Sequence, residues 1–222
     1  MKEMFRAVVF DMDGVLTETS HEHFLAWKSL AEELGFDLPD YVKDDVKGIS
    51  RMASLEIVLK AGNLKRAYTE AEKEALATKK NKIYVELIHA FTEANLSVGA
   101  RPLLEALKAH QIKIALASAS KNAPFLLKAM NIETYFDAVV DPTVITRGKP
   151  APDIFLEAAK LIGVAPEFCI GIEDAYAGIE SILGAGMKPV GIGSPHFLKN
   201  CEDVFPSIDA LDFEGLKKVW KR

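Results

Sequence analysis

The chain is poor in cysteine and has no long hydrophobic segment. Its two cysteines, Cys169 in an apolar run and Cys201 in a polar stretch, form neither a disulfide framework nor a metal-ligand motif. No stretch approaches the ~18 consecutive apolar residues that a membrane-spanning helix requires. The first residues also lack the apolar core and cleavage site of a signal peptide. We therefore expect a cytoplasmic protein, in a reducing compartment, with no membrane partner.

Basic residues are not in excess either. The chain has 27 Lys and Arg against 32 Asp and Glu, which gives a formal net charge of −5 at pH 7. A surface that binds nucleic acid is usually basic, so we expect no nucleic-acid partner. An anionic substrate would have to be held by a few locally placed cations. The sequence shows no coiled-coil or obligate-dimer pattern, and we expect a monomer.

Short apolar runs alternate with helical patterns along most of the chain. Runs typical of buried strands occupy residues 6–10, 112–117, 138–140, 168–172 and 189–192. Helical periodicity occupies residues 102–110, 123–130, 153–163 and 175–185. This alternation predicts an α/β fold, with a Rossmann-like parallel sheet core flanked by helices.

Residues 18–93 interrupt the alternation, because they contain several helical segments and no convincing strand. We predict an inserted helical cap domain at 18–93 and an α/β catalytic core domain at 1–17 and 94–222. An insertion directly after the first strand lies at the carboxyl edge of the sheet, where open α/β folds bind ligands. The inserted helices are therefore placed to act as a lid.

Local signals support helices within this insertion. One apolar face combines Phe24, Trp27 and Leu30 at three- and four-residue spacing. Ser50 is a candidate N-cap for a helix that runs to about residue 61, and Thr69 with its glutamate three residues later forms a capping-box signature.

Two aspartates stand two residues apart where the first predicted strand ends, in the segment FDMDGV. Asp11 and Asp13 can face one pocket as the chain leaves the sheet, and Gly14 allows a close approach of the backbone. A solvated acidic turn or a helix cap also explains an isolated DxDG motif. The pair alone therefore leaves its role open.

Further polar side chains follow the later strands. Ser118 ends the run IALAS, Lys149 lies in GKPAPD, and Glu173 and Asp174 end CIGIED. Because the carboxyl ends of parallel strands share one edge of a sheet, we expect all of them to meet the two aspartates in one crevice. The simpler alternatives are a solvated surface lysine for Lys149 and acids that oppose a helix dipole for Glu173 and Asp174.

Together these residues form the DxD, Ser, Lys and ED set of the haloacid dehalogenase superfamily. The sequence resembles the phosphosugar mutases in the phosphotransferase branch of that superfamily. The resemblance covers nearly the whole chain and is carried by the segments FDMDGVLTET, HFLAW, KGISR, IALASASKN, GKPAPDIF and GIEDAYAGI.

The resemblance implies catalytic roles for four residues. It implies that Asp11 is the nucleophile and carries the phosphoryl group as an aspartyl phosphate, while Asp13 is the general acid and base. Lys149 is implied to bridge Asp11 and the phosphoryl oxygens. Ser118 and the backbone amides after it are implied to donate hydrogen bonds to those oxygens.

The resemblance also implies a magnesium ion as cofactor. Asp11, the backbone carbonyl of Asp13, and Asp174 are the implied ligands, with Glu173 either a direct ligand or a support for the others. Mg²⁺ prefers oxygen ligands, and it would neutralise charge on the transferring group.

Substrate contacts are implied mostly in the predicted cap. Arg51 is the candidate for holding the distal phosphate of a bisphosphate, because a guanidinium binds phosphate bidentately. Ser120, Lys121 and Asn122 are candidates to share that phosphate. The full implied set is Thr19, His23, Trp27, Val46, Lys47, Gly48, Ile49, Ser50, Arg51, Ser54, Lys80, Ala119, Ser120, Lys121 and Asn122.

Structural alternatives remain for several of these cap residues. Trp27 has the spacing of a core residue, and His23 can be a packed or capping histidine. Lys47 and Lys80 can be solvated lysines on helix faces.

The resemblance implies a mutase that interconverts β-D-glucose 1-phosphate and β-D-glucose 6-phosphate through β-D-glucose 1,6-bisphosphate. A Mg-dependent sugar-phosphate phosphatase is the alternative, in which water takes the phosphoryl group from Asp11. A binding protein without activity is a third possibility, although the retained acids and Lys149 disfavour it. The segments KGISR and HFLAW favour the mutase.

Overall fold

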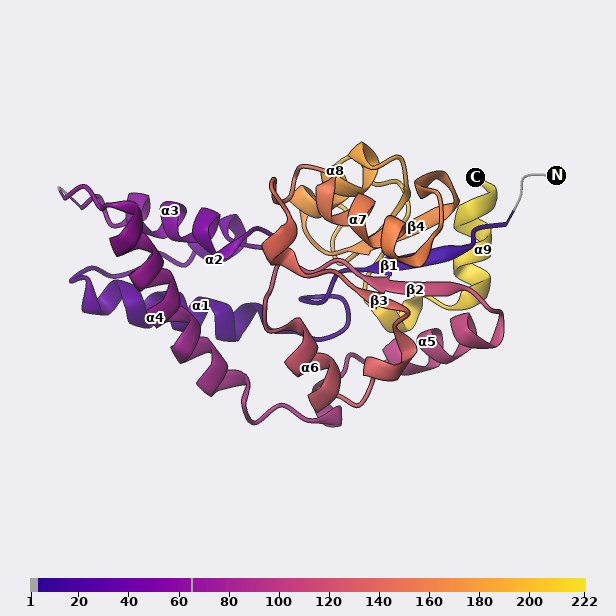
Figure 1. Cartoon of the computed structure of the whole chain (residues 1–222), viewed down its shortest axis with the longest axis horizontal. Coiled ribbons are helices and arrows are strands. Elements are labelled where there is room, and N and C mark those ends of the chain that lie inside the picture. The colour runs from indigo at the N-terminus through magenta and orange to yellow at the C-terminus, as the bar shows by residue number, and fades with distance from the viewer. Residues whose placement is uncertain (1–3, 65) are drawn as a thin grey trace.

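A parallel β-sheet forms the centre of the molecule in a computed structural model, which describes residues 4–64 and 66–222 (Figure 1). Its strands are β1 (Ala7–Phe10), β2 (Lys113–Leu116), β3 (Ala138–Val139), β4 (Cys169–Glu173), β5 (Lys188–Ile192) and β6 (Val204–Phe205). The strand order is β3-β2-β1-β4-β5-β6, and each neighbouring pair is parallel. The predicted α/β fold is confirmed, while the short edge strand β6 was not predicted.

The register of the central strands aligns their carboxyl ends. Phe10, the last residue of β1, lies opposite Leu116 of β2 and Ile172 of β4. The residues that follow in each strand therefore leave the sheet side by side. This places the polar side chains expected from the sequence at one edge.

Helices cover both faces of the sheet and bury its apolar side chains. One face packs against α5 (Ala100–Ala109), α6 (Ala123–Ala129) and α9 (Phe213–Lys221), and the other against α7 (Asp153–Ile162) and α8 (Tyr176–Gly184). Val8 and Phe10 of β1 belong to the first cluster, and Ala7 and Val9 to the second. Strand side chains alternate between faces, so β1 is buried on both sides. Short 3-10 turns occur at Glu93–Asn95, Glu133–Tyr135, Pro142–Val144, Pro166–Phe168 and Ile208–Ala210.

The remaining helices follow β1 and lie together beyond the carboxyl end of the sheet (Figure 1). They are α1 (Ser20–Glu33), α2 (Val42–Asp45), α3 (Arg51–Ala61) and α4 (Glu70–Ile88). They bury a hydrophobic cluster of their own around Trp27, Leu30 and Leu55. The helices expected in this region are thus present, whereas the domain boundaries at 17/18 and 93/94 stay a prediction.

Both predicted helix caps in this region are confirmed. The Ser50 hydroxyl accepts a hydrogen bond from the backbone N–H of Ala53 at 3.3 Å. Thr69 and Glu72 form the reciprocal capping box. Ala26 of α1 and the C-terminal part of α4, through Tyr84 and Ile88, join the main core. No helix among the described residues is long and apolar enough to cross a membrane.

The fit of α8 against β4 gives a stability prediction. A Cβ added to Gly178 would lie 1.9 Å from the carboxyl group of Glu173, which is fully buried. Alanine improves helix propensity by about 1 kcal/mol, but the clash is with a side chain held by several hydrogen bonds. We expect Gly178→Ala to lower the free energy of unfolding by about 1–3 kcal/mol, as overpacking does, in urea titrations followed by circular dichroism.

Gly184→Ala in the same helix is the matched control for this prediction. Its added Cβ would lie 3.5 Å from Pro152, an ordinary contact. We expect this variant to be as stable as the parent or more so. Equal stability of the Gly178 and Gly184 variants would contradict the tight fit at Glu173.

Candidate active site

The two aspartates of the DxDG segment lie at the end of β1. The backbone N–H of Asp11 donates to the carbonyl of Ile172 at 2.9 Å, which continues the pairing of β1 with β4 for one residue. The backbone N–H of Asp13 donates to Oδ2 of Asp11 at 3.0 Å. Gly14 has a φ of +81°, and a Cβ there would lie 1.8 Å from Oδ2 of Asp174. Glycine is therefore required where the turn passes the third acid.

Lys149 joins two of the acids. Its buried Nζ lies 2.6 Å from Oδ1 of Asp11 and 2.5 Å from Oε1 of Glu173. Burial alone would lower the pKa of Lys149, but the negative charges of Asp11 and Glu173 outweigh it and raise the pKa. The surface-lysine alternative is therefore wrong, and the lysine is charged within the site.

The acids that follow β1 and β4 converge, as the sequence predicts. Carboxylate oxygens of Asp11, Glu173 and Asp174 lie within 4.8 Å of one another. Burial, and then the proximity of Asp11, raises the pKa of Glu173 to about 8 against the opposing effect of Lys149. Burial also raises the pKa of Asp174 to about 7, against the effect of Lys47. Three converging carboxylates are a donor set that suits a hard divalent cation.

Glu173 differs from the other two acids in its contacts. Its Oε2 accepts hydrogen bonds from the backbone N–H groups of Asp174 at 2.8 Å and Ala175 at 2.9 Å, while Oε1 faces Lys149. Both oxygens are thus already engaged. The two backbone N–H groups hold Glu173 against the turn after β4, which favours a supporting position for it. Asp11 also has both oxygens engaged, by Lys149 and by the backbone N–H of Asp13.

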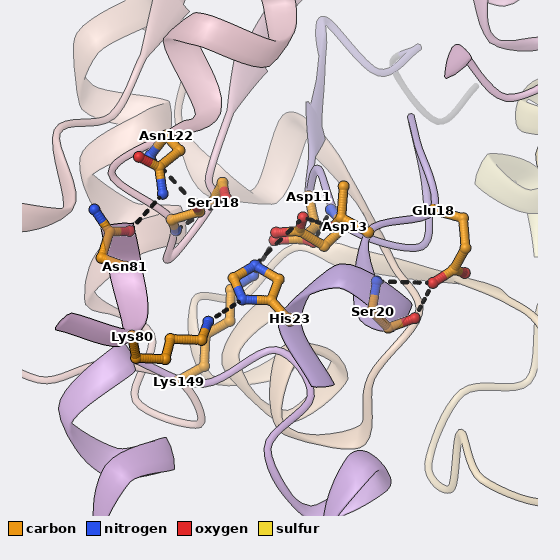
Figure 2. A network of polar contacts seen from close by, with 12 residues as sticks. Asp11, Asp13, Glu18, Ser20, His23, Lys80, Asn81, Ser118, Asn122 and Lys149 are labelled. Carbon is orange, nitrogen blue, oxygen red and sulfur yellow. Dashed lines mark hydrogen bonds and ion pairs between the residues drawn. The ribbon is translucent and has the colours of Figure 1, made fainter. Parts of the chain in front are cut away.

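Asp13 lies among polar side chains of the site, close to His23 (Figure 2). The hydroxyl of Thr19 donates a short hydrogen bond to Oδ1 of Asp13. Burial, followed by the charge of Asp11, raises the pKa of Asp13 to about 7, although Thr19 and two lysines act in the opposite direction. A carboxyl group with this pKa can exchange a proton near neutral pH.

A histidine and a lysine extend from the inserted helices toward Asp13 (Figure 2). Nζ of Lys80 lies 2.7 Å from Nδ1 of His23, and Nε2 of His23 lies 4.0 Å from Oδ1 of Asp13. Lys80 is only 2% exposed, so the solvated-lysine alternative is wrong for it. Burial, and then the charge of Arg51, lowers the pKa of Lys80 to about 7. Burial and the charge of Lys80 also hold the pKa of His23 well below its ordinary value.

Aromatic rings enclose this pair. Nζ of Lys80 lies 4.7 Å from the ring centre of Trp27 and 4.8 Å from that of Tyr84, and His23 stacks on Tyr84 at 3.9 Å. Trp27 is buried in the helical cluster, as its core-residue spacing indicates, and it also lines the pocket described below. Sequence reasoning missed Tyr84, although its four-residue spacing from Lys80 places the two on one helix face.

A pocket opens beside the two aspartates. It is lined by Asp11, Asp13, Ser20, His23, Trp27, Lys43, Val46, Lys47, Gly48, Ile49, Arg51, Ser54, Lys80, Ala119 and Ser120. Sequence reasoning missed Ser20 and Lys43. Ser20 directly follows Thr19, which was a candidate, whereas no motif marked Lys43.

The other candidates lie around this pocket. Ser50 and Lys121 line a neighbouring cavity, to which Arg51 and Lys149 also contribute. The Ser118 hydroxyl accepts a hydrogen bond from the backbone N–H of Ser120 at 3.1 Å. Asn122 donates to the side-chain oxygen of Asn81 on α4 at 2.9 Å, a contact between core and inserted helices that the sequence did not indicate.

Lys47 crosses from the inserted segment to the edge of the sheet. Its Nζ lies 2.7 Å from Oδ2 of Asp174, and about a third of its side chain is exposed. Burial alone would lower the pKa of Lys47, but the charge of Asp174 and the hydrogen bond to it raise the pKa. Lys47 therefore pairs with an acid of the site and is not a free surface lysine.

Comparisons with known proteins agree with this geometry. The profile of the haloacid dehalogenase-like hydrolase family matches residues 5–186. The chain is 44% identical to the β-phosphoglucomutase of Bacillus subtilis over 217 residues, which cover 98% of this chain and 96% of the relative. It is 31% identical to a phosphorylated carbohydrates phosphatase of Thermotoga maritima, over 83% of each chain.

A crystal structure of β-phosphoglucomutase from Clostridium difficile matches with a TM-score of 0.95 and 42% identity, covering 98% of both chains. The match to the family profile and the near full-length identity confirm the resemblance inferred from the sequence motifs. The chain therefore belongs to the haloacid dehalogenase-like hydrolase family.

Proposed function

We propose that this chain is a β-phosphoglucomutase, which interconverts β-D-glucose 1-phosphate and β-D-glucose 6-phosphate through β-D-glucose 1,6-bisphosphate. The observation that carries the proposal is the pairing of Asp11, held by Lys149, with Asp13, whose pKa is near neutral. The B. subtilis and C. difficile relatives that carry this name support it.

Asp11 is the nucleophile of the proposed reaction. One carboxylate oxygen forms a bond to phosphorus as the bond to the leaving sugar oxygen breaks, which gives an aspartyl phosphate. Lys149 holds the Asp11 carboxylate in place and offers positive charge where phosphoryl oxygens gather. Ser118, at the end of β2, is proposed to donate a hydrogen bond to the same oxygens, together with the amides that follow it.

Asp13 is proposed to carry the proton. In its protonated form it donates to the leaving sugar oxygen, and in its ionised form it takes the proton from the attacking hydroxyl of the sugar. The raised pKa makes both forms accessible near neutral pH. Thr19 fixes the carboxyl group by its hydrogen bond, and the neighbouring His23 and Lys80 complete the polar wall of the pocket.

Asp11, Asp174 and the backbone carbonyl of Asp13 are proposed to hold Mg²⁺, with Glu173 in support. Bound there, the ion would neutralise charge on the transferring phosphoryl group. The convergence of Asp11, Glu173 and Asp174 supports this donor set.

Arg51 is proposed to hold the second phosphate of the bisphosphate. It begins α3 and contributes to both the main pocket and the neighbouring cavity, as Ala119 does. Ser120 lines the main pocket and Lys121 the neighbouring cavity, and these two residues and Asn122 are proposed to share this phosphate. The other lining residues of the inserted segment are proposed to contact the sugar and to exclude water while the helices, acting as a cap, are closed.

We further infer that the enzyme is a cytoplasmic monomer.

A sugar-phosphate phosphatase is the second candidate, and the T. maritima relative supports it. The two functions share the chemistry at Asp11 and differ in whether a sugar hydroxyl or water accepts the phosphoryl group. The cationic and aromatic lining formed by Arg51, Lys80 and Trp27 favours a sugar phosphate as acceptor.

The function is tested by supplying β-D-glucose 1-phosphate, Mg²⁺ and a trace of the bisphosphate, with coupled detection of glucose 6-phosphate and a parallel assay for inorganic phosphate. We expect stoichiometric isomerisation with little free phosphate. Asp11→Asn should lower kcat by at least about 10³-fold, because the covalent step is lost. Release of phosphate without isomerisation would instead favour the phosphatase.

The distal-phosphate role is tested by Arg51→Ala and Arg51→Lys. We expect Arg51→Ala to lower kcat/KM for isomerisation by about 10- to 100-fold, the loss of one charge-assisted bidentate contact, and Arg51→Lys to recover part of it. Phosphoryl transfer to Asp11 from a small donor such as acetyl phosphate should be largely retained, as measured by mass spectrometry. Unchanged isomerisation in Arg51→Ala would refute this role.

Magnesium should stabilise the protein more at alkaline than at acidic pH. The raised pKa values of Asp13, Glu173 and Asp174 mean that these groups keep their protons in the metal-free fold at pH values where the unfolded chain has lost them. The metal-free fold therefore loses stability as the pH rises from about 4 to about 7 to 8. The ion binds the ionised carboxylates, so saturating Mg²⁺ should raise Tm clearly at about pH 8 and much less at about pH 5.5. Differential scanning fluorimetry measures this, and Asp174→Asn should abolish most of the shift. A Tm shift that is independent of pH would contradict the proposed ligand set.

A further inference from the structure

Each acid of the proposed metal site has an ammonium partner from the chain itself. Lys149 pairs with Asp11 and Glu173, and Lys47 pairs with Asp174 at 2.7 Å. The two lysines differ in exposure: the Lys149 side chain is 0% exposed, whereas the Lys47 side chain is 32% exposed. Lys47 is therefore the partner that can leave.

The backbone beside Lys47 is also docked on the core. Gly48 has a φ of +70°, and a Cβ added there would lie 2.8 Å from Cβ of Ala175. Lys47 and Gly48 of the inserted segment thus lie against Asp174 and Ala175, the two residues that directly follow β4. The contact of Lys47 with Asp174 is consequently part of a fitted interface rather than an isolated surface ion pair.

Lys47 has space to move into. It lines the pocket beside the two aspartates, and it also lines two cavities on the other sides of Asp174. Asp174 contributes to the latter two cavities. Lys47 therefore borders three cavities, two of which it shares with Asp174.

A divalent cation and this ammonium compete for one oxygen. Mg²⁺ binds carboxylate oxygens at about 2.0–2.1 Å and demands near-octahedral geometry, and two positive charges at such close range repel each other in a poorly solvated site. Asp174 is only 5% exposed, so solvent screening is weak.

We propose that Lys47 is a displaceable internal counter-ion of the metal site. It neutralises Asp174 before the metal binds, competes with Mg²⁺ for that carboxylate, and is released together with residues 46–50 when the ion binds. The freed ammonium then faces the pocket, where it is available to the anionic substrate. This proposal rests on the magnesium part of the proposed function.

The first test is isothermal titration calorimetry with MgCl₂ at constant ionic strength. We expect Lys47→Ala and Lys47→Gln to bind Mg²⁺ on the order of tenfold more tightly than the parent, the effect of removing one opposing charge next to a carboxylate. Lys47→Gln keeps a polar side chain of similar length, and matched melting curves of the metal-free variants verify folding. Lys43→Ala is the control, because Lys43 lines the same pocket without pairing with Asp174.

The second test is hydrogen exchange of a peptide that covers residues 46–50, with and without Mg²⁺. In the parent, Mg²⁺ should accelerate exchange there by several-fold. In Lys47→Ala exchange should already be fast without the ion and should change little when it is added.

The outcomes separate this proposal from the one on which it rests. Mg²⁺ affinity that is equal in the parent and both Lys47 variants, or increased equally by Lys43→Ala, would refute the counter-ion role and leave the metal site intact. Slower exchange of residues 46–50 on Mg²⁺ binding would refute the release. If the parent itself binds no Mg²⁺, the metal assignment fails, and the role of Lys47 fails with it.

Discussion

The contact of Lys149 with Asp11 and Glu173 is the interaction on which the site depends. Three carboxylates converge at the carboxyl edge of the sheet, and Asp11 and Glu173 are almost inaccessible to water. Without a buried positive charge these acids would repel one another and could not all ionise. Removing one partner of such a buried pair typically costs about 3–5 kcal/mol, because the other charge is left uncompensated. The lysine therefore makes it possible to gather negative charge where a cation and a phosphoryl group are to be bound.

The inserted segment also supplies polar and charged side chains that lie close to the acids of the site. Lys80 and His23 stand against Asp13 within a set of aromatic rings, and Lys47 faces Asp174 on the other side of the site. Both acids consequently depend on groups that are not part of the sheet. A movement of these helices would change the environment of Asp13, the proposed proton carrier, and of Asp174, the proposed metal ligand, at the same time.

Much of this arrangement could be predicted from the sequence. The parallel sheet follows from apolar runs that alternate with helical patterns, and the register of β1 with β2 and β4 then brings Asp11, Ser118 and Asp174 to one edge. The caps at Ser50 and Thr69 were also correct, because they depend on short-range hydrogen bonds that the residue types specify. Helix caps and the residues that gather at the sheet edge can thus be predicted from the sequence.

Other features depend on distances that the sequence does not specify. The strand β6 spans only Val204–Phe205, between Asp203 and Pro206, so no apolar run marks it in the sequence. The pairings of Lys47 with Asp174 and of Asn122 with Asn81 join elements far apart in the chain, and an exposed lysine or asparagine would look the same in the sequence. The burial of Lys80 between Trp27 and Tyr84 likewise depends on how α1 packs on α4.

The most direct measurement is a crystal structure of the protein with Mg²⁺, glucose 6-phosphate and a fluoride mimic of the transferring phosphoryl group. We expect the mimic to lie in line between a carboxylate oxygen of Asp11 and a hydroxyl of the sugar, with Lys149 in contact with it and Asp13 within hydrogen-bonding distance of that hydroxyl. A mimic bound away from Asp11, or in line with another side chain, would contradict the assignment of Asp11 as the nucleophile.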